Sequence, residues 1–374
     1  MTDKKTTVYP SSSFAGAAFE TLHEIVAKAR QNLSQNAWDY IVGGTETETT
    51  VRRNRLALDQ IAFRPRVLRD VSGVDPTTSQ FGRTLRLPVL LAPIGSLEAF
   101  HEEAAVPVAR AAGAFGIPHM LSSVTQPGLD AVADAAPDTL RLYQLYVRED
   151  ADGVDRIVAH AIERGIAAFA FTVDSAIYSR RERDLAKRHV TSGRRYVGGQ
   201  SFQASFDWRS IERIKKKFAI PLILKGIGTA EDAKLAVEHG VDWVYVSNHG
   251  GRQLDHGTGA MDVLPEVVAA VAGRAKIAVD GGFCRGTDIV KALAAGADLV
   301  GLGRMQCYGL AAGGEAGVVR VLELLEDEVR RCLMMLGADR LAALERANLQ
   351  PAAAVNPPGV LSAFPLLEIP PYRY

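Results

Sequence analysis

A histidine and an arginine lie three residues apart in the stretch VSNHGGRQLD, which runs from Val246 to Asp255. The residues Trp243–Val246 form an apolar run typical of a buried parallel strand, so His249 and Arg252 are expected where a strand ends and the chain turns. Histidine accepts a proton near neutral pH, and arginine binds a carboxylate through two parallel hydrogen bonds. A base beside an anion clamp is the chemistry needed to oxidise a hydroxy acid.

The elements that would position this pair follow a repeated pattern of short apolar run, loop and helical stretch. Eight apolar runs occur, at Val89–Ala92, His119–Leu121, Leu140–Tyr146, Ala168–Val173, Leu222–Lys225, Trp243–Ser247, Ile277–Asp280 and Leu299–Gly303. Helical patterns follow most of them, and glycine often marks the helix end. The alternation predicts an α/β fold with a parallel sheet, and eight units favour a closed (β/α)8 TIM barrel over an open doubly wound sheet.

The barrel is expected to be the centre of one domain that spans the whole chain. Helical periodicity over Phe14–Val42 predicts N-terminal helices, and Gly309–Leu336 predicts a long C-terminal helix. The remaining boundaries are a barrel core at about 86–320, a polar loop over the barrel mouth at about 188–207, and a proline-rich tail at 350–374.

Composition excludes several classes of partner. Lys+Arg and Asp+Glu both number 43, so net charge gives no reason to expect nucleic acid or an anionic membrane surface. No apolar run approaches the roughly 18–20 residues of a spanning helix, and the N-terminus has no secretory core. The three cysteines, Cys284, Cys307 and Cys332, lack metal-ligand or redox spacing. We therefore expect free thiols, no metal site and a cytoplasmic protein.

Polar side chains gather at the carboxyl ends of the predicted strands, where such barrels place their active sites. Taken singly, each could be a helix cap or a satisfied core amide, but their shared location indicates a site. They are Ser122, Gln144, Tyr146, Thr172, Asp174, Lys225, Ser247, His249, Arg252, Asp280 and Arg304, with the backbone of Gly303 beside Arg304.

Two glycine-rich turns follow the last two predicted strands. Asp280-Gly281-Gly282 and Gly301-Leu302-Gly303-Arg304 occupy the usual phosphate position of a (β/α)8 barrel, where backbone amides surround the oxygens. No Gly-x-Gly-x-x-Gly turn suggests a dinucleotide fold instead. These turns predict a phosphorylated cofactor or substrate.

From Trp38 to Gly337 the chain resembles the FMN-dependent 2-hydroxy acid oxidising enzymes, a family that includes glycolate oxidase, lactate oxidase, lactate monooxygenase and mandelate dehydrogenase. The Ser-Asn-His-Gly-Gly-Arg-Gln stretch is highly specific for it. Further matches are Phe63-Arg64-Pro65-Arg66, Tyr143-Gln144-Leu145-Tyr146, Thr172-Val173-Asp174, Arg180-Arg181-Glu182 and Gly313-Gly314-Glu315-Ala316-Gly317. The resemblance implies a TIM barrel that binds FMN across its mouth, usually as a homotetramer.

The resemblance also implies roles for individual residues. His249 is the expected base, Asp174 stabilises its protonated form, and Tyr146 bonds the substrate hydroxyl. Arg252 and Tyr40, assisted by Arg181, would hold the substrate carboxylate, and Lys225 would lie beside the flavin. The remaining cofactor contacts would come from Pro93, Ile94, Gly95, Ser122, Gln144, Thr172, Ser247, Asp280, Gly281, Gly282, Gly303 and Arg304.

Four positions depart from the family pattern. Cys284 replaces an arginine that reaches the flavin phosphate, and Arg285 follows it. Val124 replaces a bulky aromatic residue and Gly95 replaces an alanine, which together predict a wide pocket for mandelate-like or medium-chain acids unless Phe202 or Phe206 fills it. Met305 takes the place of a proline and has no functional account.

Oxidation of an L-2-hydroxy acid to a 2-oxo acid is therefore the expected reaction. Oxygen is the expected electron acceptor, with monooxygenase and dehydrogenase chemistry as alternatives. Hydride and carbanion routes both remain open. An FMN-dependent isomerase, or a flavin-binding homologue without activity, is the alternative of another class; the His249–Arg252 pair and Tyr40 favour a carboxylate substrate over a diphosphate.

Overall fold

The computed structural model describes residues 19–191 and 200–368. Eight parallel strands close into a barrel in the order β10-β11-β4-β5-β6-β7-β8-β9. Each overlaps one of the predicted apolar runs, so the predicted barrel is confirmed. The strands are β4 (Val89–Leu91), β5 (His119–Ser122), β6 (Arg141–Leu145), β7 (Ala168–Thr172), β8 (Leu222–Ile227), β9 (Trp243–Val246), β10 (Lys276–Val279) and β11 (Leu299–Leu302).

Alternation along each strand separates two cores. One set of side chains, including Leu90, Met120, Leu142 and Tyr245, fills the barrel interior. The other set packs outward against the helices, as Val244 and Val246 do. The interior is therefore solid, and ligands can bind only where the strands end.

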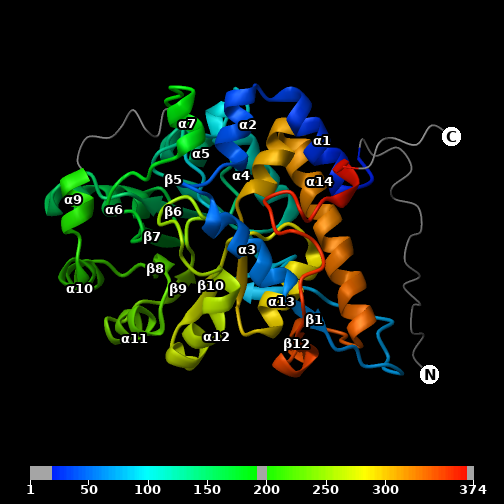
Figure 1. The fold of residues 1–374 in the computed structure, drawn as a ribbon. Helices are drawn as coiled ribbons and strands as arrows, with labels where there is room; N and C mark the ends of the chain where they lie inside the picture. The colour runs from blue at the N-terminus through cyan, green and yellow to red at the C-terminus, as the bar shows by residue number, and fades with distance from the viewer. Residues whose placement is uncertain (1–18, 192–199, 369–374) are drawn as a thin grey trace.

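The covering helices follow the strands in the expected way (Figure 1). α14 runs along one side with the N-terminal helix α1 packed against it, and its helical geometry breaks at Gly313 and Gly314. None of the helices in the described ranges is long and apolar enough to cross a membrane. The helices are α1 (Leu22–Asn32), α2 (Gln35–Val42), α3 (Thr49–Asp59), α4 (Ala105–Phe115), α5 (Leu129–Ala135), α6 (Ala151–Glu163), α7 (Glu182–Ala186), α9 (Gln200–Ser205), α10 (Trp208–Lys217), α11 (Ala230–Glu238), α12 (Ala260–Val271), α13 (Gly286–Ala294) and α14 (Arg304–Leu336).

Shorter elements tie the ends of the chain to the barrel. β1 (Ile61–Phe63) pairs antiparallel with β12 (Leu349–Pro351), and β2 (Thr78–Gln80) pairs with β3 (Arg83–Leu85). After β12 the chain packs against α1, where the ring of Phe364 meets the His23 ring edge-on with 5.7 Å between the ring centres. The 3-10 turns are η1 (Leu97–Ala99), η2 (Leu341–Ala343), η3 (Arg346–Asn348) and η4 (Pro365–Glu368).

The segment expected to form a loop over the mouth, 188–207, is described in part. Residues 192–199 lie outside the described residues, and α9 occupies 200–205. Gln203 of α9 accepts a hydrogen bond from the Val147 amide (2.7 Å) and donates one to the Thr172 carbonyl (3.0 Å). This side chain attaches α9 to the ends of β6 and β7.

Candidate active site

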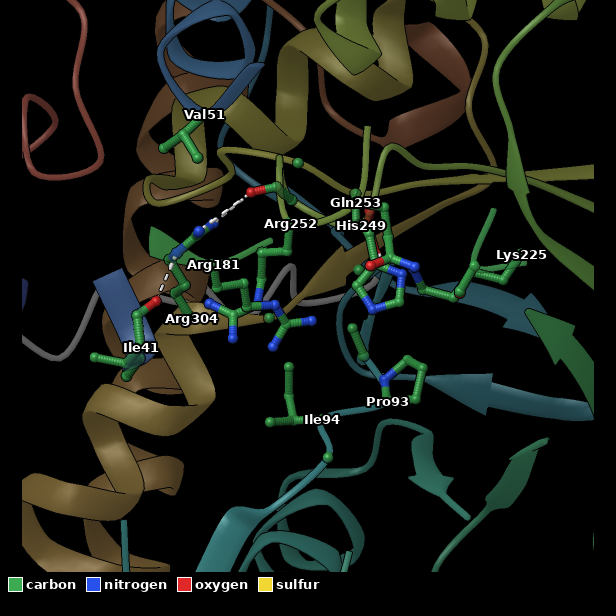
Figure 2. Close-up of a pocket in the computed structure, with 18 of the residues that line it drawn as sticks. Ile41, Val51, Pro93, Ile94, Arg181, Lys225, His249, Arg252, Gln253 and Arg304 are labelled. Atoms are coloured by element: carbon green, nitrogen blue, oxygen red, sulfur yellow. Dashed lines mark hydrogen bonds and ion pairs between the residues drawn. The ribbon is translucent and has the colours of Figure 1, made fainter. Parts of the chain in front are cut away.

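A deep cavity opens at the carboxyl ends of the barrel strands. In Figure 2, Arg181 and Arg252 point into the same space above Ile94, while His249 and Lys225 lie beside it near Pro93. Most of the predicted site residues line this cavity: Tyr40, Pro93, Ile94, Gly95, Tyr146, Arg181, Lys225, His249, Arg252, Asp280, Gly281, Gly282, Gly303 and Arg304. Ser122, Gln144, Thr172, Asp174 and Ser247 are not in its lining and lie next to it.

His249 is held from two sides in the turn after β9. Its Nδ1 lies 3.0 Å from Oδ1 of Asp174, and its Nε2 lies 3.1 Å from the Tyr146 hydroxyl. Because a carboxylate can only accept, Nδ1 carries the proton and Nε2 has the free lone pair. His249 also adopts a left-handed backbone (φ 60°), which is uncommon outside glycine and is found at strained functional turns.

The electrostatics keep this imidazole neutral at rest. Burial lowers the pKa of His249 below its ordinary 6.5, partly opposed by Asp174 and reinforced by Lys225 and Arg181. Burial also opposes ionisation of Asp174, but the His249 charge and hydrogen bond outweigh it and its pKa is lowered. Burial raises the pKa of Tyr146, so its hydroxyl stays protonated. A neutral base beside a fixed carboxylate is suited to accept a proton.

Two arginines and a tyrosine lie together on the other side of the cavity. The guanidinium of Arg252 lies 4.7 Å from the centre of the Tyr40 ring, and that of Arg181 lies 5.9 Å from it. Burial, together with the charge of Arg181, lowers the pKa of Arg252 to about 10. Within residues 19–191 and 200–368 neither arginine forms an ion pair with a carboxylate, so a ligand carboxylate would relieve their repulsion.

Lys225 projects from β8 into a buried polar chain. Its Nζ donates to Ser247 Oγ (2.7 Å) and lies 3.1 Å from Oδ2 of Asp280, and the Ser247 hydroxyl donates to Oδ1 of Asp280 (2.6 Å). Three neighbouring strand ends, β8, β9 and β10, supply these groups. This hydrogen-bonded chain holds the ammonium group of Lys225 at the cavity wall.

Arg304 lies at the end of the cavity away from Lys225 (Figure 2), where it donates to the backbone carbonyls of Ile41, Gly43 and Gly250 (2.9–3.1 Å). Cys284 lines the same end as a buried thiol, and burial raises its pKa to about 12. Arg285 does not replace the missing arginine, because its side chain forms an ion pair with Glu328 and donates to the Ala363 carbonyl.

Two buried polar atoms without hydrogen-bond partners in the described part of the chain indicate that the cavity fits FMN. Gln144 accepts from the Ser122 hydroxyl (2.8 Å), yet its Nε2 is buried without a partner among the described residues, and so is Oγ1 of Thr172. Buried polar atoms nearly always have a hydrogen-bond partner. A ligand that offers both acceptors and donors would supply partners for these two atoms. Among the described residues Arg304 has carbonyl partners but no carboxylate partner, so its charge is not neutralised and would favour a phosphate nearby.

Gly95 and Val124, the two small residues near the mouth, lie against each other. This corrects the expectation that the space gained at one position adds to the space gained at the other. A Cβ on Gly95 would lie 2.8 Å from Cγ2 of Val124, so the valine already takes the room of an alanine methyl. Phe206 stacks on Phe171 outside the barrel (5.0 Å between ring centres), and Phe202 is exposed and not in the cavity lining. Neither phenylalanine refills the space that an aromatic residue at position 124 would occupy.

Sequence reasoning missed several lining residues. Asn54 and Arg55 come from α3, a helix that hydrophobic periodicity did not predict because half of its buried residues are polar. Arg55 forms a bidentate pair with Asp288 (2.8 Å for both bonds) and bonds Asp59 as well. Further examples are Phe100, Tyr178, Gln203 and Val360, which carry no motif.

Comparison with known proteins supplies the family. The model of the FMN-dependent dehydrogenase family matches residues 29–351.

This chain belongs to the FMN-dependent dehydrogenase family.

Its relatives include an L-lactate oxidase of Nostoc sp., 36% identical with 88% of this chain and 97% of the relative covered. A glycolate oxidase of Spinacia oleracea is 37% identical, with 88% and 95% covered. A crystal structure of mandelate oxidase with (S)-2-phenylpropionate superimposes with a TM-score of 0.83 at 34% identity, covering 90% of this chain and all of that one. The expected family and fold are confirmed, FMN is the cofactor, and the protein is an FMN-dependent enzyme of the 2-hydroxy acid oxidising class.

Proposed function

We propose that this protein oxidises L-2-hydroxy acids with a bulky apolar substituent to 2-oxo acids and passes the electrons to oxygen. The observation that carries the proposal is the pairing of a neutral, carboxylate-backed histidine with two arginines that lack carboxylate partners in the described chain, facing the same cavity. A 2-hydroxy acid presents a hydroxyl proton and a carboxylate at matching positions.

Each protein group has a defined task in this reaction. Arg181 and Arg252, with Tyr40, bind the substrate carboxylate and orient the alpha carbon. His249 takes a proton at Nε2, and Asp174 stabilises the imidazolium that results. FMN, when bound, supplies the two-electron acceptor. Pro93, Ile94, Gly95, Ser122, Gln144, Thr172, Lys225 and Ser247 would hold its ring and ribityl chain, and the turns at Asp280–Gly282 and Gly303–Arg304 its phosphate.

The preference for a bulky substituent rests on the apolar wall near Gly95. Ile94, Val124 and Val147 line the cavity, and neither Phe202 nor Phe206 is part of its lining. A phenyl or alkyl group that buries roughly 100 Å² there would gain about 2.5 kcal/mol, or ~60-fold in kcat/KM over glycolate. The mandelate oxidase structure holds a phenyl-bearing carboxylate, which agrees with this choice. Glycolate and L-lactate, the substrates in the names of the sequence relatives, are the alternative.

An anaerobic titration of the purified holoenzyme tests the proposal. Addition of L-mandelate or L-2-hydroxyoctanoate should bleach the flavin absorbance, and air should restore it. A preference for glycolate over both acids would reject the bulky-substrate proposal. Bleaching without reoxidation by air would assign a different electron acceptor.

We further propose a cytoplasmic homotetramer, on the strength of the family resemblance and of the three buried free thiols, which suit a reducing compartment. Size-exclusion chromatography with light scattering would test the assembly: a single species of four chains supports it, and a monomer rejects it.

A further inference from the structure

The C-terminal half of α2 and the loop to α3, residues 39–48, form one wall of the carboxylate-binding side of the cavity. Arg252 donates to the backbone carbonyls of Tyr40 (2.6 Å) and Gly43 (3.0 Å). The Tyr40 ring lies under the same guanidinium. Any shift of this segment therefore moves both Tyr40 and Arg252.

The outer side of segment 39–48 is bridged by one arginine of α7. Arg183 binds both carboxylate oxygens of Glu48, through Nε (2.6 Å) and Nη2 (2.8 Å), and its Nη1 lies 3.2 Å from Oδ1 of Asp39. Lys187, the residue that follows α7, also pairs with Asp39. α2 and α7 lie side by side (Figure 1), so these ion pairs join the two helices.

The bridge is set in a partly buried place and is charged at neutral pH. The side chains of Asp39 and Glu48 are 9% and 19% exposed, against 41% for Arg183. Burial opposes ionisation of Glu48, but the hydrogen bonds from Arg183 and from the Gly44 amide outweigh it and its pKa is lowered. Such pairs are screened less than fully exposed ones.

Arg181 stands two residues before Arg183, at the N-cap of α7. Its guanidinium is over the Tyr178 ring (4.8 Å) and faces Tyr40. The Arg180 carbonyl accepts hydrogen bonds from the backbone amide of Glu46 (2.8 Å) and from the side-chain hydroxyl of Thr45 (3.1 Å), which fix where α7 begins. The side-chain bridge of Arg183 fixes the turn that follows, and with it the distance between Arg181 and the α2 wall.

We propose that Arg183, acting through Glu48 and Asp39, is a positioning residue for the substrate carboxylate. It is not part of the cavity lining; it holds α7 against α2 so that Arg181, Arg252 and Tyr40 converge on one anion. This rests on the proposed function, in which those three side chains bind the carboxylate. Removing the bridge should weaken binding of the carboxylate in the ground state and transition state alike, which raises KM more than it lowers kcat.

The test compares Arg183→Met with Arg180→Met in the FMN-loaded enzyme. Arg180 is an exposed arginine next to α7 whose side chain, among the described residues, pairs only with Glu182. Phenylacetate, a carboxylate without a hydroxyl to oxidise, is titrated by the absorbance change of bound FMN, and KM and kcat are measured with L-mandelate. Arg183→Met should lose about three- to tenfold in phenylacetate affinity, with a similar rise in KM and little change in kcat or FMN content.

Two further variants make the result specific. Glu48→Gln keeps an acceptor for the Gly44 amide but removes the charge, and should cause a smaller loss of the same kind. The double variant should be no worse than Arg183→Met, because both changes break one bridge. If Arg183→Met does not fold, Glu48→Gln carries the comparison alone.

An unchanged phenylacetate affinity, an equal loss in Arg180→Met, or strictly additive losses in the double variant would overturn the positioning role. If no carboxylate perturbs the flavin of the parental enzyme, the proposed function fails instead, so the two failures can be told apart.

Discussion

Replacing Asp174 by asparagine isolates the contribution of one buried charge to catalysis. Asparagine has nearly the same shape as aspartate, so the turn and the FMN content should persist. The carboxylate lies 3.0 Å from Nδ1 of His249, and the pair is largely buried. At an effective dielectric constant of about 20, two charges ~4 Å apart attract by about 4 kcal/mol. An amide dipole retains part of this, which leaves a loss of roughly 2–4 kcal/mol.

That loss corresponds to about 30- to 900-fold in the rate of flavin reduction. Rapid mixing of the anaerobic holoenzyme with saturating L-mandelate measures this rate directly. Asp130→Asn makes the same change at an exposed carboxylate outside the cavity, and should reduce its flavin at the parental rate.

The pH dependence of kcat/KM is an independent test, because the direction in which its acidic limb shifts is predicted. Burial lowers the pKa of His249, and the charge and hydrogen bond of Asp174 raise it. Since the neutral imidazole is the base, kcat/KM falls as the pH drops through this pKa. The parental acidic limb should therefore lie below pH 6.5, and the limb of Asp174→Asn lower still. A rate within about threefold of the parent, or a limb that moves to higher pH, would refute the reasoning.

Three other changes test separate parts of the site. Lys225→Met removes the cation held by Ser247 and Asp280. It should lower the reduction potential of bound FMN by roughly 30–60 mV (about 1.4–2.8 kcal/mol), with less effect on FMN affinity. An unchanged potential would reject the position of Lys225 beside the flavin ring. Val124→Trp should fill the apolar space and reverse the preference for L-mandelate over glycolate, as steady-state kcat/KM with both acids will show. Cys284→Arg adds a cation at the Arg304 end of the cavity and should tighten FMN binding to the apoprotein about tenfold, whereas Cys284→Ser should not; equal dissociation constants from fluorescence titration would place the phosphate elsewhere.

The barrel could be predicted because its signals are local. Each strand is a continuous apolar run, and the carboxyl ends of parallel strands must meet at one end of the barrel, so His249, Lys225 and Asp280 could be placed together from their positions alone. The helix α3 was not predicted because its buried face carries Asn54 and Arg55, which bond Asn248 and Asp288 more than 190 positions away. A polar face satisfied by distant partners leaves no hydrophobic period in the sequence.

The details of the cavity could not be predicted from the sequence for a similar reason. The alanine methyl absent at Gly95 and the aromatic residue absent at Val124 are separate signals in the sequence, yet in space the valine occupies the place of the methyl. The direction of Arg285 was equally open, because only the fold brings Glu328 within reach of it. Contacts between elements far apart in the chain decide such points, and no local pattern encodes them.

The central claim is that His249 is the base in the oxidation of a 2-hydroxy acid. His249→Gln keeps a hydrogen-bonding side chain between Asp174 and Tyr146 but cannot accept the proton. Anaerobic mixing of the FMN-loaded variant with L-mandelate measures the claim most directly, with absorbance confirming bound flavin beforehand. The account predicts full FMN content and a reduction rate lower by ~10²–10⁴-fold. Reduction at close to the parental rate would contradict it.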